Sequence, residues 1–334
     1  MEFRTPIQIP RSDVSIDHAT RILSMGSCFS ERIGRMLSDA KFRIDMNPFG
    51  ILYNPLSISC ALQRLISATP FSESDLVFHH GMYHSMMHHG RFSSADPTVC
   101  LSRIAERFES AARRLPQTDF LLVTLGTAFV YRWNLTGAIV GNCHQFPADQ
   151  FHRFRLSVQV IVEEWSRSIE MLRQRHPDVK LIFTISPIRY LKEGAVENQR
   201  SKSTLHLSID ALQCLFPEHT DYFPAYEIVM DELRDYRFYN DGMLHPSSAA
   251  VDYIWQRFSE TYFSDDTKEA VAAWMPIRKA LSHRPLHPDA ASYRIFLENT
   301  LQRLSAFQER YPQICCDGEK QIVLQELTEL KKDI

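Results

Sequence analysis

Short apolar runs alternate with amphipathic segments from residue 20 to about residue 264. The runs at 21–25, 119–125 and 179–185 are almost continuously apolar, which is typical of strands buried on both faces. We expect shorter strands at 41–46, 75–78 and 222–229. Apolar residues at intervals of three and four predict helices, which we expect at 26–40, 54–66, 95–115, 155–175, 202–214 and 248–263.

Buried strands that alternate with helices predict an α/β fold, in which a parallel sheet carries helices on both faces. Ligands of such folds bind at the carboxyl ends of the strands, where the connecting loops meet. The loops expected at this edge are 26–29, 47–54, 126–129, 186–190 and 239–245. Residues 129–140 interrupt the alternation with the pattern of a hairpin, which turns at 135–137.

Beyond residue 264 the apolar residues keep helical spacing, but a polar interruption follows at 283–289 and the end of the chain is charged. We therefore expect an α/β domain over residues 1–264. A helical extension over 265–334 is expected to pack on this domain or on a partner.

Composition narrows the class of protein. The chain has 334 residues, 44% of them apolar, and a net charge of −3, which does not favour binding to nucleic acid or to an anionic membrane. Its purely apolar runs span only a few residues, whereas a membrane-spanning helix needs about 18 or more. The N-terminus lacks a secretory signal pattern, and the seven cysteines are irregularly spaced. We expect a cytoplasmic protein with reduced thiols.

Ser27 and Cys28 lie where the first strand passes into the first helix. Unpaired N–H groups and the helix dipole at such a junction favour a nucleophile, because they stabilise the oxyanion that forms. Serine is also among the best helix N-caps, so Ser27 is either a nucleophile or a cap. A thiol at this position can also act as a nucleophile, although buried structural cysteine is the commoner case.

Asp241 precedes His245 by four residues, in the loop before the last helix of the expected α/β domain. A carboxylate at this distance can orient an imidazole and select its tautomer, as in a catalytic triad. The sequence Asn240–Asp241–Gly242 is also typical of a simple turn. Because this loop and Ser27 belong to the same expected sheet edge, we expect them to lie close together.

The sequence GSCFS at 26–30 differs by one residue from the motif after which the GSCFA family is named, and the chain resembles that family. Further agreement lies in NPFGILYNP at 47–55, LGTAFVY at 125–131, GNCHQFP at 141–147, SPIRYLKEG at 186–194, NQRSKS at 198–203 and the segment 222–247. The family is similar to SGNH (GDSL-type) hydrolases, which implies a three-layer α/β/α, flavodoxin-like sheet. By this resemblance Ser27 is the nucleophile, His245 the base and Asp241 the orienting carboxylate of a serine ester hydrolase.

The resemblance also implies that the backbone N–H groups of Ser27 and Gly50 bind the oxyanion. The chain departs from the superfamily in two ways. Asp241 and His245 are four residues apart rather than three, and the segment 126–129 lacks the asparagine that normally donates to the oxyanion. Thr127 and Asn142 are the candidate replacements for this donor.

Other side chains near the expected edge are candidates to line a substrate cleft, namely Cys28, Asn54, His88, Arg189 and Lys202. For the lysine and the arginine the ordinary alternative is a solvated surface position. The segment 78–90 holds five histidines, some of them four residues apart, as in a helical metal site. However, Gly81 disfavours a helix and no Asp, Glu or Cys completes the set, so we expect no metal and no other cofactor.

We therefore expect a hydrolase of a small-molecule or carbohydrate ester with a small acyl group such as acetyl. The alternatives are an O-acyltransferase that uses a sugar acceptor and a non-catalytic binding protein that retains the fold. The oligomeric state is left open.

Overall fold

A computed structural model describes residues 4–285 and 291–330 of the chain, which divide into two compact units. The first unit consists of the N-terminal segment to residue 10, residues 21–35 and residues 44–258. The second consists of 11–20, 36–43 and the chain from residue 259 onward. Most of the helical extension expected over 265–334 is described, but residues 286–290 of the polar interruption and the last residues, 331–334, lie outside the described residues.

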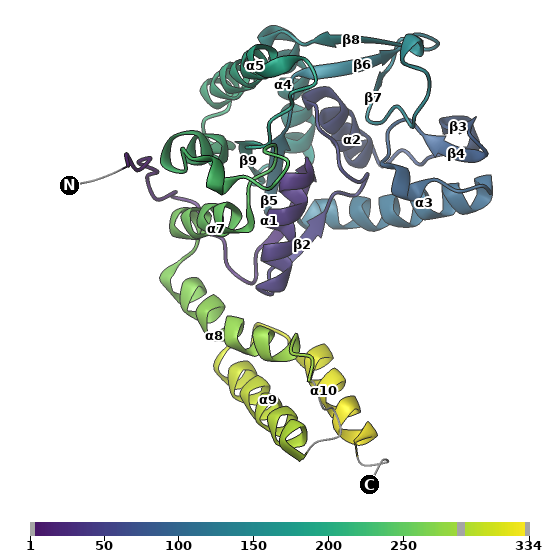
Figure 1. Ribbon diagram of the computed structural model, residues 1–334. Coiled ribbons are helices and arrows are strands. Elements are labelled where there is room, and N and C mark those ends of the chain that lie inside the picture. Colours follow the sequence, from purple (N-terminus) through teal and green to yellow (C-terminus); the bar gives the residue numbers. More distant parts are fainter. Residues whose placement is uncertain (1–3, 286–290, 331–334) are drawn as a thin grey trace. The chain divides into compact units, whose positions relative to one another are not determined.

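The first unit is built on a five-stranded sheet with the strand order β10-β9-β5-β1-β2 (Figure 1). The strands are β1 (Arg21–Gly26), β2 (Arg43–Met46), β5 (Phe120–Leu125), β9 (Lys180–Ile185) and β10 (Thr220–Phe223). β1, β5, β9 and β10 run parallel, and Val123 in β5 lies opposite both Met25 and Phe183. This is the flavodoxin-like strand order, so the predicted α/β fold is confirmed.

Helices cover both faces of this sheet. They are α1 (Cys28–Asp39), α2 (Pro55–Ser67), α3 (Pro97–Arg114), α4 (Val158–Arg175), α5 (Gly194–Leu215) and α7 (Ser248–Tyr262). α2, α4 and α5 pack in a row on one face, where the ring centroids of Trp165 and Phe183 lie 5.0 Å apart in an edge-to-face arrangement. Because side chains alternate along a strand, Leu121 and Val123 of β5 face this row while Leu122 faces α1 and α7.

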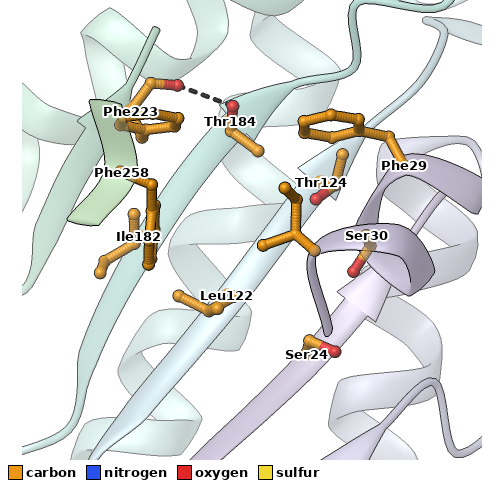
Figure 2. A pocket seen from close by; sticks show the side chains of 10 residues that line it. Ser24, Phe29, Ser30, Leu122, Thr124, Ile182, Thr184, Phe223 and Phe258 are labelled. Carbon is orange, nitrogen blue, oxygen red and sulfur yellow. Dashed lines mark hydrogen bonds between the residues drawn. The ribbon is translucent and has the colours of Figure 1, made fainter. Parts of the chain in front are cut away.

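A small cavity lies between the sheet and the other helix layer (Figure 2). Phe29 and Ser30 from α1 and Phe258 from α7 line it together with residues of β1, β5, β9 and β10. Its volume is about 30 Å³, close to that of one water molecule, whereas ligand pockets usually enclose about 300 Å³ or more. The cavity is therefore an interior packing defect and too small for a substrate.

Two small antiparallel sheets extend from the first unit. β3 (Leu76–His79) and β4 (Met82–Ser85) form a hairpin, and β6 (Phe129–Trp133) pairs with β7 (Ile139–Val140) and β8 (Phe151–Arg155). The hairpin predicted at 129–140 is confirmed. The histidine-rich segment is also a hairpin, which turns at His80 and Gly81, both with positive φ.

The sequence-based prediction was wrong at one strand and at two helix boundaries. A strand was expected at 222–229, but β10 ends at Phe223, because Pro224 has no N–H for the sheet. The helix α6 (Ala225–Glu227) and a π-helical turn (Ile228–Glu232) follow. The helix expected from residue 155 begins at Val158 after the Ser157 N-cap, and the helix expected from residue 202 begins at Gly194.

The second unit contains three helices of the C-terminal region, α8 (Asp265–Leu281), α9 (Ala291–Arg310) and α10 (Asp317–Glu329). Trp274, Leu304, Phe307 and Val323 belong to their common apolar core. The expected helical character of this region is confirmed. Among the described residues, none of the helices has the length and apolar character that crossing a membrane requires.

Candidate active site

The junction of β1 and α1 is tightly constrained. Gly26 has a φ of +148°, and a Cβ at this position would lie 2.3 Å from the Thr124 carbonyl oxygen, so only glycine fits. Ser27 follows and is fully buried, with an exposed fraction of 0%. Its Oγ accepts a hydrogen bond from the Phe29 N–H at 3.3 Å, and its own N–H donates to the Thr124 oxygen. In this structure Ser27 therefore acts as the N-cap of α1.

Cys28 is the partly exposed residue of this junction. The backbone N–H groups of Cys28 and Phe29 act on its sulfur and favour the thiolate, but burial outweighs them and raises the pKa of the Cys28 thiol. The thiol interacts electrostatically with the side chains of Tyr53, Tyr190 and Lys202. We call Cys28, Tyr53, Tyr190 and Lys202 the strand-edge cluster. The Tyr53 and Tyr190 ring centroids lie 5.7 Å apart, Lys202 Nζ lies 5.5 Å from the centre of the Tyr190 ring, and Cys28 begins α1 just beyond the end of β1.

Lys202 is the fully buried member of this cluster, with an exposed fraction of 0%. Its Nζ donates to the carbonyl oxygens of Gly126 at 2.7 Å and Ser186 at 2.6 Å, just beyond the ends of β5 and β9. No carboxylate forms an ion pair with Lys202 within residues 4–285 and 291–330. Burial lowers the pKa of Lys202 to about 7, because charged ammonium is poorly solvated there.

Tyr190 brings a hydroxyl group to the cluster. Its backbone N–H donates to Asn198 Oδ1 at 2.9 Å, which fixes the loop after β9 against α5. The Tyr190 hydroxyl is shielded from solvent and has no hydrogen-bond partner in the described part of the chain. A Cβ at Gly126 would lie 3.0 Å from this hydroxyl oxygen, so the glycine leaves room for the tyrosine. Burial raises the pKa of Tyr190, which keeps the hydroxyl protonated.

One face of α5 carries buried polar residues that support the strand-edge cluster and the loops beside it. Asn198, Ser201 and Lys202 are all buried at helical spacing, at positions where apolar residues are usual. Ser201 Oγ accepts the Ala128 N–H at 2.8 Å and so supports the loop after β5. Tyr190, Asn198 and Ser201 were not among the residues expected at the site. The polar residues at 198, 201 and 202 within one helix were the signal that could have found this face.

Several of the groups predicted to bind the oxyanion already take part in other hydrogen bonds. The Gly50 N–H donates to the Asn47 oxygen at 2.8 Å. Thr127 Oγ1 is paired with Ser201 Oγ at 3.1 Å and accepts the Phe129 N–H. The Asn142 N–H donates to the Met86 oxygen, while its Oδ1 accepts the His144 N–H at 2.9 Å. Their role as oxyanion donors, including that of the Asn142 side-chain amide, stays a prediction.

Asp241 and His245 are both exposed. Within the described residues, neither side chain hydrogen-bonds to the other or to Ser27. Their loop is nevertheless fastened beside α1, because Arg32 Nη1 donates to the Pro246 oxygen at 3.1 Å. The Arg189 N–H holds the same loop through the Leu244 oxygen at 3.0 Å.

Three further cleft candidates occupy different environments. Asn54 is the N-cap of α2, and its Oδ1 accepts the Ser57 N–H at 2.8 Å. His88 is buried and stacks on Phe49 at 4.7 Å, and burial lowers the pKa of His88 to about 3, so it stays neutral. Both are therefore structural residues here. Arg189 is one of the residues that line an open pocket of about 230 Å³.

The histidine-rich segment is satisfied by ordinary hydrogen bonds. His84 Nδ1 pairs with Ser93 Oγ at 2.7 Å, and His144 Nε2 pairs with the Ser85 oxygen at 2.9 Å. Over the described ranges, no group of three His, Cys, Asp or Glu side chains has the arrangement of a metal site. All seven cysteines are free, although only Cys100 and Cys316 are fully buried.

Comparisons with known proteins agree with this architecture in part. The profile of the GSCFA family matches residues 21–258, and the profile described as the GSCFA domain protein, C-terminal domain, matches residues 274–329. No curated protein matches the chain in sequence. Among solved structures, the chain is similar to an acetyl xylan esterase (Est2A) from the rumen bacterium Butyrivibrio proteoclasticus. The identity is 11%, the match covers 75% of this chain and 67% of the esterase chain, and the TM-score is 0.35.

Proposed function

The chain belongs to the GSCFA family, and from this premise we propose that it is an ester hydrolase that forms a covalent acyl intermediate at the start of α1. The observation that carries the proposal is the junction of β1 and α1. It places a hydroxyl, Ser27, and a thiol, Cys28, at a helix N-terminus and at the carboxyl edge of a flavodoxin-like sheet. Helix N–H groups there stabilise the negative charge of an acyl-transfer intermediate.

With Ser27 as nucleophile, the mechanism is the triad implied by the family. Ser27 Oγ attacks the ester carbonyl, His245 takes its proton, and Asp241 orients the imidazole. Arg32 of α1 holds the loop that carries His245, and this contact supports the triad mechanism. The triad mechanism requires that Ser27 Oγ give up its hydrogen bond from the Phe29 N–H. It also requires that the exposed His245 side chain turn toward Ser27.

We further propose that the substrate is a small-molecule or carbohydrate ester with a small acyl group. The open pocket lined by Arg189 supports this, since it borders the loop that carries His245. Arg234, Tyr236 and Tyr239 also line this pocket. Tyrosine rings and guanidinium groups offer apolar faces with polar edges, which suits a ligand with many hydroxyl groups.

The test is hydrolysis of p-nitrophenyl acetate and of a panel of acetylated sugars. The wild-type protein is compared with Ser27→Ala, with Cys28→Ala and with the double variant. We expect turnover by the wild-type protein that the double variant lacks, because every acyl intermediate at this junction needs one of the two side chains. Equal rates for the wild-type protein and the double variant would contradict the proposed function.

Labelling with a fluorophosphonate probe separately tests the triad. If Ser27 is activated by His245, the label is lost in Ser27→Ala and His245→Ala and is kept in Cys28→Ala. A wild-type protein that hydrolyses esters without taking up the label would contradict the role of Ser27.

A further inference from the structure

We propose, on the basis of the proposed function, that the ester is carried by an acidic sugar, whose carboxylate or phosphate binds to Arg189 and Arg234. Both side chains line the open pocket of about 230 Å³ described above, which we call the Arg189 pocket. This volume is below the ~300 Å³ or more of pockets for drug-sized ligands and suits a single sugar ring. The pocket has apolar, aromatic and cationic parts, and each part favours a different feature of such a ligand.

The apolar wall of the Arg189 pocket is formed where a π-helical turn follows α6. Side chains of this turn and of the residue after it form the wall, namely Val229, Met230 and Leu233. π-helical turns are rare and are found frequently at functional sites. Glu232, the last residue of the turn, is buried and accepts a hydrogen bond from the Ile7 N–H. The N-terminal segment therefore holds the turn in place.

Two tyrosines give the pocket its aromatic surface. The ring centroids of Tyr236 and Tyr239 lie 6.2 Å apart, with the ring planes inclined by 46°. The Tyr239 hydroxyl donates to Met230 Sδ at 3.6 Å, which orients its ring, whereas Tyr236 is 66% exposed and open to a ligand. A sugar ring carries C–H groups on its faces and hydroxyls around its edge. It can therefore pack on a tyrosine ring while its hydroxyls stay hydrogen-bonded.

Arg189 and Arg234 bring positive charge to the same pocket. Arg189 Nη1 donates to the Met243 oxygen at 3.3 Å, and its Cζ lies 5.7 Å from the centre of the Tyr239 ring. These contacts orient the guanidinium group and leave most of its N–H groups available to a ligand. Neither arginine forms an ion pair with a carboxylate in the part of the chain that the structure describes. Guanidinium groups bind carboxylates and phosphates through paired hydrogen bonds.

Asp235 also lines the Arg189 pocket, but a neighbouring arginine balances its charge. Asp235 Oδ1 accepts the Arg237 N–H at 2.9 Å, and its Oδ2 lies 3.7 Å from Arg237 Nε. The guanidinium groups of Arg189 and Arg234 are therefore not neutralised by the acidic residue beside them. The resulting excess of positive charge favours an anionic ligand over a neutral one.

The Arg189 pocket is joined to the loop that carries His245. Tyr239 lines the pocket and pairs with Pro246 in an antiparallel bridge. Within the loop that this bridge closes, the Asn240 N–H donates to the His245 oxygen at 2.8 Å. A sugar bound in the pocket is therefore held beside the loop of the proposed base. Binding of its acidic group, at a distance from the ester, then helps to position the ester for reaction.

Calorimetric titration of the full chain tests the pocket without any ester. The ligands are methyl glucuronide, which carries a carboxylate, glucose 6-phosphate and the neutral methyl glucoside. We expect at least one acidic sugar to bind about tenfold more tightly than the neutral sugar, because hydrogen bonds between charged groups are stronger. A preference for the glucuronide assigns the carboxylate, and a preference for glucose 6-phosphate assigns the phosphate. Equal affinity for all three sugars, or no binding of any of them, would overturn the proposal.

Arginine variants show whether this preference arises in the Arg189 pocket. We expect Arg189→Gln and Arg234→Gln each to lower the affinity for the acidic sugar by about tenfold. Arg234 is exposed, so we expect its variant to keep the fold. The matched control is Arg113→Gln, which removes the same charge at an exposed position of α3 outside the pocket and should leave the affinity unchanged. A folded Arg234→Gln with the wild-type preference would contradict the role of these arginines.

Hydrolysis separates a failure of this proposal from a failure of the proposed function. Acetylated methyl glucuronide and acetylated glucose 6-phosphate are compared with acetylated methyl glucoside. We expect kcat/KM to be about tenfold higher for an acidic ester, and we expect Arg234→Gln to lose most of this ratio while Arg113→Gln keeps it. Equal kcat/KM values would overturn the acidic specificity and leave the proposed function standing. Binding of acidic sugars without hydrolysis of any ester would overturn the proposed function and retain the pocket as a binding site for acidic sugars.

Discussion

At the scale of single residues, Lys202 shows how burial changes the protonation of a side chain. Lys202 looks like an ordinary cation in the sequence, where it was a candidate to line the substrate cleft or to lie on the solvated surface. The structure places it fully inside the protein, where its Nζ binds two backbone oxygens. Since burial lowers the pKa of Lys202 to about 7, the residue changes from a fixed charge into a group that gains and loses a proton near neutrality.

Lys202 should therefore make the stability of the protein depend on pH. Its pKa lies at about 7 in the folded protein and near 10.5 in the unfolded chain. Between these values the unfolded chain binds more protons, so the free energy of unfolding rises with pH. From pH 7.0 to 8.5 we expect the wild-type protein to gain about 1–2 kcal/mol relative to Lys202→Met, measured by urea unfolding. A difference that stays constant over this range would contradict the lowered pKa.

At the scale of elements, the segment between β2 and α2 takes its shape from the conformation and hydrogen bonds of its own residues. Gly50 turns the chain with a φ of +81°, and Asn54 caps the helix that follows. Both residues were expected near the substrate. In the structure each satisfies a backbone requirement of its own segment.

Replacing Gly50 by alanine should therefore destabilise the protein for two reasons. The positive φ is unfavourable for alanine, and the added Cβ would lie 2.3 Å from the Cβ of His89. We expect Gly50→Ala to lower the free energy of unfolding by about 2–4 kcal/mol in urea titrations. Gly137→Ala is the control, because it shares a positive φ of +73° but meets nothing within 4 Å, and we expect a loss of about 1 kcal/mol. Equal losses would show that the close approach to His89 has no effect.

The role of Asn54 can be separated from substrate binding by a pair of substitutions. Asn54→Ala removes the side-chain oxygen that accepts the Ser57 N–H, and we expect a loss of about 1 kcal/mol of stability. Asn54→Asp keeps this acceptor and is expected to retain most of the stability. If urea unfolding gives both variants the same stability as the wild-type protein, the cap does not support α2.

At the scale of the whole molecule, the two compact units do not follow a single cut in the sequence. The second unit combines α8–α10 with residues 11–20 and 36–43. Within it, the Trp274 indole N–H donates to the Asp39 oxygen at 2.7 Å, and the Lys41 ammonium lies 5.0 Å from the centre of the Trp274 ring. Segments that are more than 200 residues apart along the chain therefore contact one another within this unit.

Trp274 should accordingly support the second unit as a whole. Trp274→Ala removes a buried ring and the partner of Asp39, which typically costs about 3–5 kcal/mol. We expect hydrogen exchange in α8, α9 and α10 to become about a hundredfold faster or more. Met275→Ala, at the exposed neighbour, should leave exchange unchanged. Equal exchange in the two variants would contradict the central place of Trp274.

The sequence by itself determined the elements whose cause is local. Continuous apolar runs predicted β1, β5 and β9, and apolar residues at helical spacing predicted the helix at 54–66 that the structure shows as α2. The family and the loops of the sheet edge also followed from short motifs. These predictions succeeded because periodicity, caps and turns depend on neighbours within a few residues. The strand at 222–229 failed because the apolar pattern hid the effect of Pro224, which ends the pairing.

Only the tertiary structure decided which side chains meet at this edge. Adjacent residues in a helix point about 100° apart, so the packing of α1 determines that Ser27 is buried as a cap and that Cys28 joins the cluster. The partners of Lys202 lie 76 and 16 residues away in the chain, and no local pattern indicates them. The triad of Ser27, Asp241 and His245 stays a prediction. Burial changes the proton affinity of each group, and burial is a property of the folded chain alone.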